Sequence, residues 1–372
     1  MIEVLKEYFE GITDTRQEWK VKHNLLEIIV MTICAVIAGC DVWEDIEDFC
    51  RVKESWFRET LHLTLGNGIP SHDTMQRVWG MIEPEEFEKR FCEWVEAVSH
   101  KVDGDIISVD GKTVRRSGEK RKKPIHMVSA WSNQQQMVLG QLATDEKSNE
   151  ITAVPELLEI LDVSGCIVTA DAMSCQKAIT EKITEKKADY VLGLKENHPL
   201  FHQEVEEYFS AALNEPQNYP LVKKTETTDY GHGRIEHRTY YLTTEVAWYE
   251  GIKDWSNLRS FGMVVSKTTY QDKTTEDSRL FISSLEDISA FQNAVRKHWG
   301  IENSLHWCLD MVFREDYSRI RKDHSAENMA VVRHISLNLL KAHPSKISLA
   351  RKRRRCSYDD TFLAQVLLSV HA

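Results

Sequence analysis

Two short apolar runs, each closed by an aspartate, constrain this 372-residue chain more than any other feature. Residues 106–109 read Ile-Ile-Ser-Val and lead into Asp110, and residues 166–170 read Cys-Ile-Val-Thr-Ala and lead into Asp171, 61 positions later. Short apolar runs rich in β-branched residues are typical of buried β-strands. The pattern therefore predicts two buried strands that end in carboxylates at one edge of a sheet.

The order of the predicted elements indicates the fold. The elements are strands at residues 106–109, 125–131 and 136–142, a helix at 152–161, a strand at 166–170, a helix through Ile179 and Ile183, and a strand at 190–194. Short loops allow the first three strands to pair antiparallel, and helical crossovers make the later strands parallel. This is the order of an RNase H-like α/β core, in which the first and fourth strands are neighbours. We therefore expect Asp110 beside Asp171.

Four segments are predicted along the chain. They are a helical domain at 1–100 for DNA-end binding or dimerisation, the first part of the core at 101–215, a β-rich insertion at 216–286, and the completion of the core with C-terminal helices at 287–372. Apolar residues at helical spacing over 25–37 and a proline followed by two glutamates at 84–86 indicate helices in the first segment. Strands at 221–229, 234–242, 258–267 and 279–284 make up the insertion, and residues 288–311 and 325–342 are expected to be helical.

A third acid completes the candidate metal site. On a helix, His298, Glu302 and His306 are spaced by four residues and share one face. Carboxylates that converge on one point favour Mg²⁺ or Mn²⁺, and two such ions can act together in phosphodiester chemistry. We expect Asp110 to bridge two ions, Asp171 to bind one and Glu302 the other.

Other ligand sets stay open at this point. Asp310, Glu315 and Asp316 compete with Glu302 as the third acid, and Glu150 is a further candidate whose position favours helix-start capping. The two histidines could belong to a zinc site, but no third nitrogen or sulfur ligand is spaced for one.

Basic residues near these acids predict contact with nucleic acid, although the formal net charge is −11. The acidic excess lies almost wholly in residues 1–100. A basic run over 112–123 includes Lys112, Arg115, Arg116, Lys120, Arg121, Lys122 and Lys123. Such a run can neutralise phosphates and release counterions, or it can be a solvated loop. Further candidate DNA contacts are Lys195, Asn197, Arg234, His298 and His306, and the run at 351–355 is a less anchored one.

Cysteine usage and hydropathy indicate the compartment. None of the eight cysteines forms a Cys-x-x-Cys pair, which suits buried thiols in a reducing cytosol. The most apolar run, at 25–40, is only 16 residues long and contains Glu27, whereas a membrane span needs about 20 apolar residues. We expect a cytoplasmic protein without a signal peptide or a membrane partner.

Four motifs resemble, in order, the signatures of DDE insertion-sequence transposases: residues 109–112, 169–173, 232–238 and 298–303. The stretches at 32–37, 43–46 and 144–151 resemble the H-repeat-associated (ISAs-type) branch, and the likeness runs from about residue 10 to 370. The resemblance implies an RNase H-like core and a catalytic triad at Asp110, Asp171 and Glu302. Where many members of the class have Arg and Lys, this chain has His298 and His306.

The function implied is DNA transposition. Such an enzyme cuts double-stranded DNA at the terminal inverted repeats of its element with two Mg²⁺ or Mn²⁺ ions, then joins the ends to target DNA. The resemblance further implies a homodimer and a bacterial, nucleoid-associated location. Two alternatives remain: an RNase H-like nuclease that does not join strands, and an inactive, domesticated DNA-binding protein.

Overall fold

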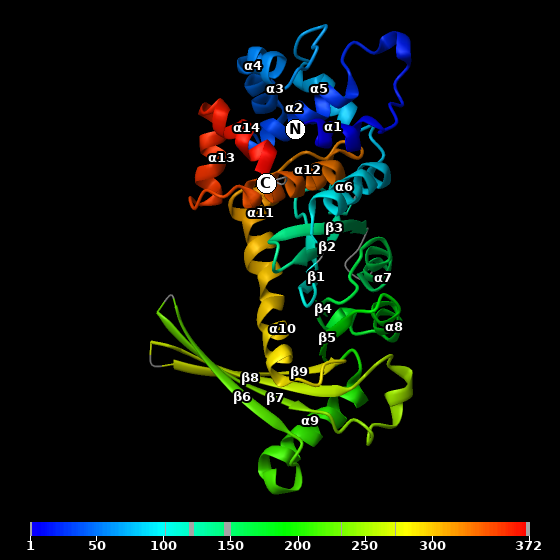
Figure 1. Ribbon diagram of the computed structural model, residues 1–372, viewed down its shortest axis with the longest axis vertical. Coiled ribbons are helices and arrows are strands. Elements are labelled where there is room, and N and C mark those ends of the chain that lie inside the picture. Colours follow the sequence, from blue (N-terminus) through cyan, green and yellow to red (C-terminus); the bar gives the residue numbers. More distant parts are fainter. Residues whose placement is uncertain are drawn as a thin grey trace. The chain divides into compact units, whose positions relative to one another are not determined.

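The computed structural model describes residues 2–100, 102–118, 123–144, 150–231, 233–271 and 273–369 (Figure 1). The chain forms two compact units: unit 1 comprises Met1–Lys101, Gly111–Asn149 and Glu302–Ala372, and unit 2 comprises Val102–Asp110 and Glu150–Ile301. All eight cysteines are free thiols, and six of them are buried as expected. Across the described ranges, none of the helices is long and apolar enough to cross a membrane.

Unit 1 is mostly helical. Its elements are α1 (Ile2–Glu10), η1 (Glu18–Lys20), α2 (Leu25–Ile37), α3 (Trp43–Val52), α4 (Glu54–Thr60), α5 (His72–Trp79), α6 (Pro84–Val98), β2 (His126–Ser132), β3 (Met137–Thr144), η6 (Glu302–His306), α11 (Trp307–Met311), η7 (Glu315–Tyr317), α12 (Ser325–Ala342), α13 (Leu349–Tyr358) and α14 (Asp360–Leu368). The expected helix at 25–37 is confirmed, and Pro84 lies in the first turn of α6. The hydroxyl of Ser71 caps α5 by accepting from the amide of Thr74.

Helix α12 is the centre of unit 1, because nearly all of its side chains are buried. It packs against α2, α6 and β3. The side-chain amide of Asn328 donates to the carbonyls of Trp79 (3.0 Å) and Ile82 (2.9 Å), and Asn338 exchanges two hydrogen bonds of 2.9 Å with the main chain of Val138. The N-terminal helices therefore share one core with helices from the far end of the chain.

The basic run at 351–355 forms part of α13 and precedes the short last helix α14. Lys352 and Arg353 are buried. Lys352 donates to the carbonyls of Leu340 and His343 at 2.7 Å, and Arg353 donates to that of Val36 at 2.8 Å. These two cations therefore cap main-chain acceptors inside unit 1.

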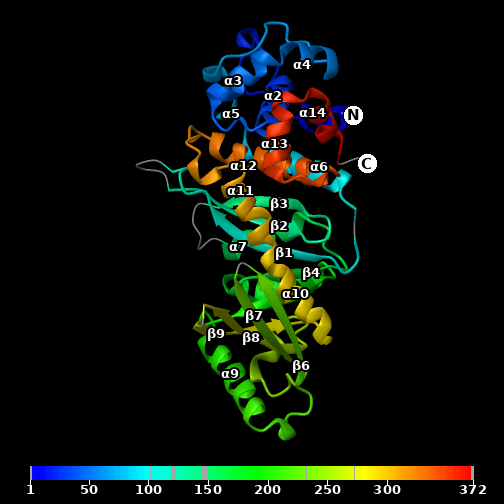
Figure 2. The same ribbon diagram turned by 90° about the vertical axis from the view of Figure 1, so that its left-hand side faces the viewer.

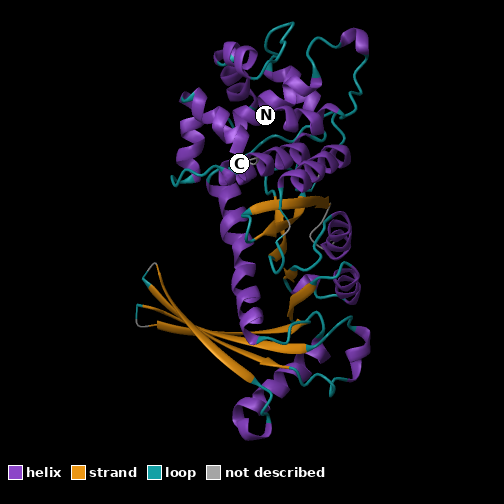
Figure 3. Ribbon diagram, viewed as in Figure 1, coloured by secondary structure: helices purple, strands orange, loops and turns teal. Residues whose placement is uncertain are grey.

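Unit 2 contains the sheet that carries both aspartates. Its strands follow the order β1 (Ile106–Thr113), β4 (Ile167–Ala170), β5 (Asp189–Leu194), β9 (Lys273–Ser283), β8 (Ser260–Tyr270), β7 (Arg234–Thr243) and β6 (Lys223–Gly231). As predicted, β1 pairs with β4 in parallel, and β4 pairs with β5 in parallel. The β-rich insertion continues the same sheet, because β9 pairs antiparallel with β5 (Figure 3).

One strand end differs from the prediction. Strand β1 does not stop at Asp110 but runs on to Thr113, and its last three residues belong to unit 1. There the amide of Val114 donates to the carbonyl of Ile125, just before β2, which pairs antiparallel with β3. Asp110 thus lies inside β1, one residue beyond the last position at which β1 pairs with β4.

Helices cover both faces of the sheet in unit 2. These are α7 (Glu150–Ile160), α8 (Lys177–Glu185), α9 (Pro199–Asn214) and α10 (Ile288–Ile301), with short 3₁₀ turns η3 (Ala172–Ser174), η4 (Pro216–Asn218) and η5 (Glu250–Asp254). Phe201 of α9 packs edge-on against Phe261, whereas Phe291 of α10 lies against Gly262. Because neighbouring residues of a strand face opposite ways, α9 and α10 lie on opposite faces of β8 (Figures 1 and 2).

Candidate active site

The register of β1 and β4 brings the two predicted aspartates together. The last paired positions are Val109 and Ala170, so Asp110 and Asp171 are the next residues on two neighbouring parallel strands. Both residues are partly buried. Neighbouring strands lie about 4.8 Å apart, so the main-chain positions of Asp110 and Asp171 are adjacent where β4 ends. The expected adjacency of the first and fourth strands is confirmed.

The turn after β4 holds Asp171 in place. Its Oδ1 accepts hydrogen bonds from the amides of Met173 (3.0 Å) and Ser174 (3.3 Å) and so caps the 3₁₀ turn η3. The side chain of Asn197, in the loop after β5, donates to the carbonyl of Ala172 at 2.7 Å. Asn197, a predicted DNA contact, therefore also braces the turn that presents Asp171.

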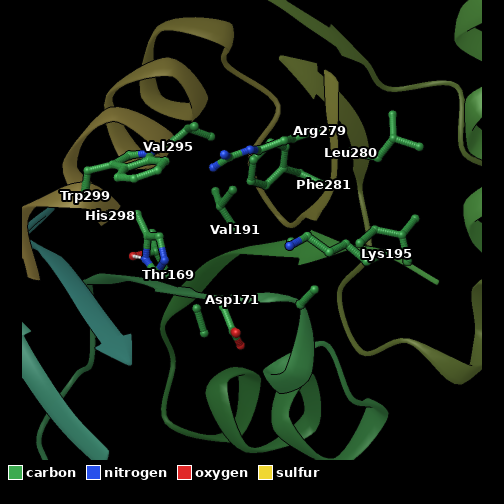
Figure 4. A pocket seen from close by; sticks show the side chains of 14 residues that line it. Thr169, Asp171, Val191, Lys195, Arg279, Leu280, Phe281, Val295, His298 and Trp299 are labelled. Atoms are coloured by element: carbon green, nitrogen blue, oxygen red, sulfur yellow. Dashed lines mark hydrogen bonds between the residues drawn. The ribbon is translucent and has the colours of Figure 1, made fainter. Parts of the chain in front are cut away.

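Asp171 borders a cavity of about 100 Å³ (Figure 4). Its walls are largely apolar and include Val191, Phe281 and Val295, whereas Lys195 and Arg279 bring positive charge to it. The guanidinium of Arg279 lies 5.0 Å from the ring of Trp299, a side chain that is 41% exposed. In Figure 4 the amine of Lys195 points into this cavity. Two cationic side chains therefore line the cavity that Asp171 borders.

His298 lines the same cavity as a neutral imidazole. Its Nδ1 lies 3.0 Å from the hydroxyl of Thr169. Burial lowers the pKa of His298 to about 4, the nearby charge of Asp171 opposes this, and Arg279 adds to it. At neutral pH the side chain therefore carries no positive charge. A contact between His298 and DNA stays a prediction. Such a contact would be a hydrogen bond and not an attraction between charges.

Glu302 follows α10 directly and is exposed to solvent. The expected helical segment at 288–311 is confirmed, as α10, a π-helical turn at Glu302–His306 and α11 in succession. Single π-helical turns inside helices occur frequently at functional sites, because the extra residue re-aims neighbouring side chains. The acid assigned to the triad thus stands at a local irregularity of its own helix.

Lys112 lies in an acidic cluster of unit 1 and is only 11% exposed. Its Nζ is 2.8 Å from Asp310, 2.9 Å from Glu315 and 3.4 Å from Asp316. Burial alone would lower the pKa of Lys112, but these carboxylates, Glu315 first, raise it above its ordinary value. The three acids that are alternatives to Glu302 as the third metal ligand are thus ion-paired with Lys112. Lys112 in turn presents little charge to solvent.

His306 lies in the interior of unit 1. Burial, reinforced by the charge of Lys112, lowers its pKa to about 3, so the imidazole is neutral at physiological pH. Its role as a phosphate contact stays a prediction. Glu150, the other candidate ligand, is the buried first residue of α7.

The remaining predicted DNA contacts are exposed. The side chain of Arg115 is 80% exposed and lies 3.3 Å from Asp316, while Arg116 stacks over Tyr317 at 5.3 Å. Arg234 begins β7 next to a hairpin, and Lys195 follows β5. Residues 119–122, 145–149 and 232, which belong to the basic run and the family-like motifs, lie outside the described residues. Cationic side chains on the surface are thus available at Arg115, Arg116, Lys195 and Arg234.

Three features of this region were not apparent from the sequence. They are the stack of Arg279 on Trp299, the hydroxyl of Thr169 beside His298, and the partners of Lys112. Thr169 is the one hydroxyl residue in the otherwise apolar run at 166–170, which is the one signal that could have found it. The other two depend on contacts between distant segments.

The donor set fits a hard divalent cation. Two carboxylates on adjacent strand positions repel each other unless a cation neutralises them, and oxygen ligands suit Mg²⁺ or Mn²⁺. Both amide bonds to Asp171 use Oδ1. Asp110 and Asp171 therefore meet the chemical requirements of such a site.

Comparison with known proteins identifies the family. Residues 6–95 match the family model described as DDE_Tnp_1-associated, and residues 102–339 match the model described as Transposase DDE domain. The chain is 42% identical to "Putative transposase YncI" of Escherichia coli O157:H7, over 99% of this chain and 95% of that protein. It is 40% identical to "H repeat-associated putative transposase YhhI" of Escherichia coli K12, over 98% and 97%. The chain therefore belongs to the DDE-domain transposase family, together with the N-terminal region associated with that domain.

Proposed function

We propose that this protein cuts DNA at the terminal inverted repeats of an insertion element and joins the freed ends to target DNA, with Asp110, Asp171 and Glu302 as its catalytic acids. The observation that carries the proposal is the parallel register that makes Asp110 and Asp171 neighbours at one sheet edge. The DDE-domain match over residues 102–339 supports it, because divalent metals are general in that family.

The three acids would hold two Mg²⁺ or Mn²⁺ ions. Bound ions would supply Lewis-acid activation of the attacking oxygen and neutralise charge on the leaving oxygen. Most of what remains for the protein is positioning and charge stabilisation. Lys195 and Arg279 provide positive charge beside Asp171, and Asn197 keeps the Asp171 turn in place.

DNA binding would rest on exposed cations together with the associated N-terminal region. Arg115, Arg116, Lys195 and Arg234 are exposed and would contact phosphates, which gives affinity without sequence preference. A homodimer would hold two element ends together, with residues 1–100 as an end-binding or dimerisation domain. We retain the four-segment organisation, at 1–100, 101–215, 216–286 and 287–372, as part of the proposal.

The test is cleavage of a duplex that carries the inverted repeats flanking the coding sequence, with Mg²⁺ present. We expect nicking by the wild type and its loss in Asp110→Asn and Asp171→Asn, which keep side-chain size and, at 171, an oxygen that can cap η3. Asp162→Asn is the matched control and should cut normally. Asp162 is exposed and lies shortly before the start of β4, away from Asp171. Retained cleavage in Asp110→Asn would contradict the triad.

A second assay separates the alternatives. Offered a pre-cut end and a target plasmid, a transposase joins the two, whereas a nuclease only hydrolyses. An inactive DNA-binding protein would bind the repeats, and calorimetry would show no Mg²⁺ binding that depends on the three acids.

A further inference from the structure

A polar side chain precedes each of the three acids by two or four residues in the sequence. Ser108 precedes Asp110 by two residues on β1, Thr169 on β4 precedes Asp171 by two, and His298 on α10 precedes Glu302 by four; Asp171 and Glu302 directly follow β4 and α10. Residues two apart on a strand share a face, and residues four apart on a helix are neighbours on its surface. The three polar side chains therefore lie on β1, β4 and α10, within unit 2, shortly before each acid in the sequence.

These side chains are hydrogen-bonded in series within unit 2. The hydroxyl of Thr169 donates to that of Ser108 at 3.2 Å, and the hydroxyl of Ser108 donates to the carbonyl of Lys297 at 3.4 Å. Each hydroxyl has one proton, so Thr169 can meet His298 only as an acceptor. The 3.0 Å contact is then a bond from the Nδ1–H of His298 to Thr169, the contact drawn in Figure 4.

The series joins β1, β4 and α10 through polar side chains in the interior of unit 2. Ser108 and Thr169 are buried, and their strand neighbours Ile107, Val109 and Val168 are apolar. A buried hydroxyl without a partner costs about 1–3 kcal/mol, whereas an apolar side chain would pack there in any register. Polar side chains at these positions therefore favour one alignment of β1, β4 and α10.

We propose that Ser108, Thr169 and His298 form a positioning relay that sets the alignment of the carboxylate-bearing elements for Mg²⁺. The proposal rests on the proposed function, because it takes the three acids as metal ligands. Mg²⁺ demands near-octahedral oxygen ligands at about 2.0–2.1 Å, whereas Ca²⁺ accepts about 2.3–2.6 Å and variable geometry. A loosened relay should therefore cost affinity for Mg²⁺ more than for Ca²⁺, which a general loss of stability would not do.

The experiment is calorimetric titration of the full-length protein with Mg²⁺ and, separately, with Ca²⁺. Thr169→Val keeps the side-chain shape and removes the hydroxyl that connects Ser108 to His298. We expect Mg²⁺ affinity to fall about tenfold, the equivalent of one lost hydrogen bond, and Ca²⁺ affinity to change by less than about twofold. Thr169→Ser restores the hydroxyl and should restore the Mg²⁺ to Ca²⁺ affinity ratio.

Thr180→Val is the matched control. Thr180 is also fully buried in unit 2, and its hydroxyl donates to the carbonyl of Lys177 at 2.8 Å within α8. The Mg²⁺ to Ca²⁺ affinity ratio of Thr180→Val should equal that of the wild type. Ser108→Ala removes the hydroxyl at the other end of the relay, so it should also lower the Mg²⁺ to Ca²⁺ affinity ratio. Combined with Thr169→Val, it should lower that ratio little further.

The outcomes separate this proposal from the proposed function. If Asp110→Asn abolishes Mg²⁺ binding while Thr169→Val and Ser108→Ala keep the wild-type ratio, the relay is refuted and the metal site stands. If Asp110→Asn binds Mg²⁺ as the wild type does, the metal assignment falls and the relay with it. Equal losses for both cations in Thr169→Val would also overturn the relay.

Discussion

Replacing Lys112 by methionine should reverse the pH dependence of stability in unit 1. The substitution keeps the unbranched stem and removes the ammonium from three carboxylates, of which Glu315 is the most buried, at 1% exposure. Burial by itself raises the pKa of Glu315, but Lys112 and then Arg333 overcome this and hold it below its ordinary value. Arg333, 3.4 Å away, would be left as the main neutralising partner.

The magnitude follows from the burial of the pair. Removing one partner of a buried ion pair costs about 3–5 kcal/mol, and because Arg333 remains we expect about 3 kcal/mol at pH 7. In the wild type the lowered pKa of Glu315 makes a stabilising contribution that is present above the unfolded-state pKa and lost as the pH falls. In Lys112→Met, burial dominates, so Glu315 binds its proton more tightly when folded and stability falls as the pH rises.

Urea unfolding at pH 5 and pH 7, followed by tryptophan fluorescence, measures this. The variant should be about 1–2 kcal/mol more stable at pH 5 than at pH 7, whereas the wild type should be no more stable at pH 5. The double variant Lys112→Met with Glu315→Gln should lose the reversed slope. Lys177→Met, which breaks an exposed pair with Asp254, should cost less than about 1 kcal/mol. Parallel slopes in wild type and Lys112→Met would refute the reasoning.

Three further predictions concern packing, a buried cation and DNA. Gly262→Ala should destabilise the protein by about 1–3 kcal/mol in urea unfolding, because the added methyl would fall on the ring of Phe291; an unchanged midpoint would contradict that packing. Arg353→Met should lower the free energy of unfolding by about 3 kcal/mol in the same assay, since main-chain carbonyls lose a buried donor. A loss below about 1 kcal/mol would contradict this role of Arg353. Arg115→Ala with Arg116→Ala should reduce the slope of log affinity against log salt for repeat DNA by about 0.9 per lost phosphate contact, and an equal slope would exclude both residues from the interface.

Much of the sheet could be predicted because its signals are local. The apolar runs before Asp110 and Asp171 are short and β-branched, and a helical crossover between two strands of one sheet makes them parallel. Proline at 84 and the Ser71 cap likewise act within a few residues of their helices. Such elements could be placed from periodicity and turn chemistry alone.

Charged residues were less predictable, because a count of charges does not say which of them meet water. Lys112 heads a basic run but lies among three acids that follow Glu302 by 8 to 14 positions. Lys352 and Arg353 belong to the most basic stretch of the chain and are buried against carbonyls. Partners this distant in sequence leave no periodic signal.

The sequence by itself determined that the strands before Asp110 and Asp171 are parallel neighbours, since strand order and the hand of the crossovers follow from the order of elements. Only the tertiary structure decided that β1 continues past Asp110, that a π-helical turn begins at Glu302, and that the hydroxyl of Thr169 forms a hydrogen bond with Nδ1 of His298. The physical reason is the range of the interactions. Strand and helix formation depend on neighbours along the chain, whereas burial, pKa and hydrogen-bond partners depend on side chains that folding alone brings together.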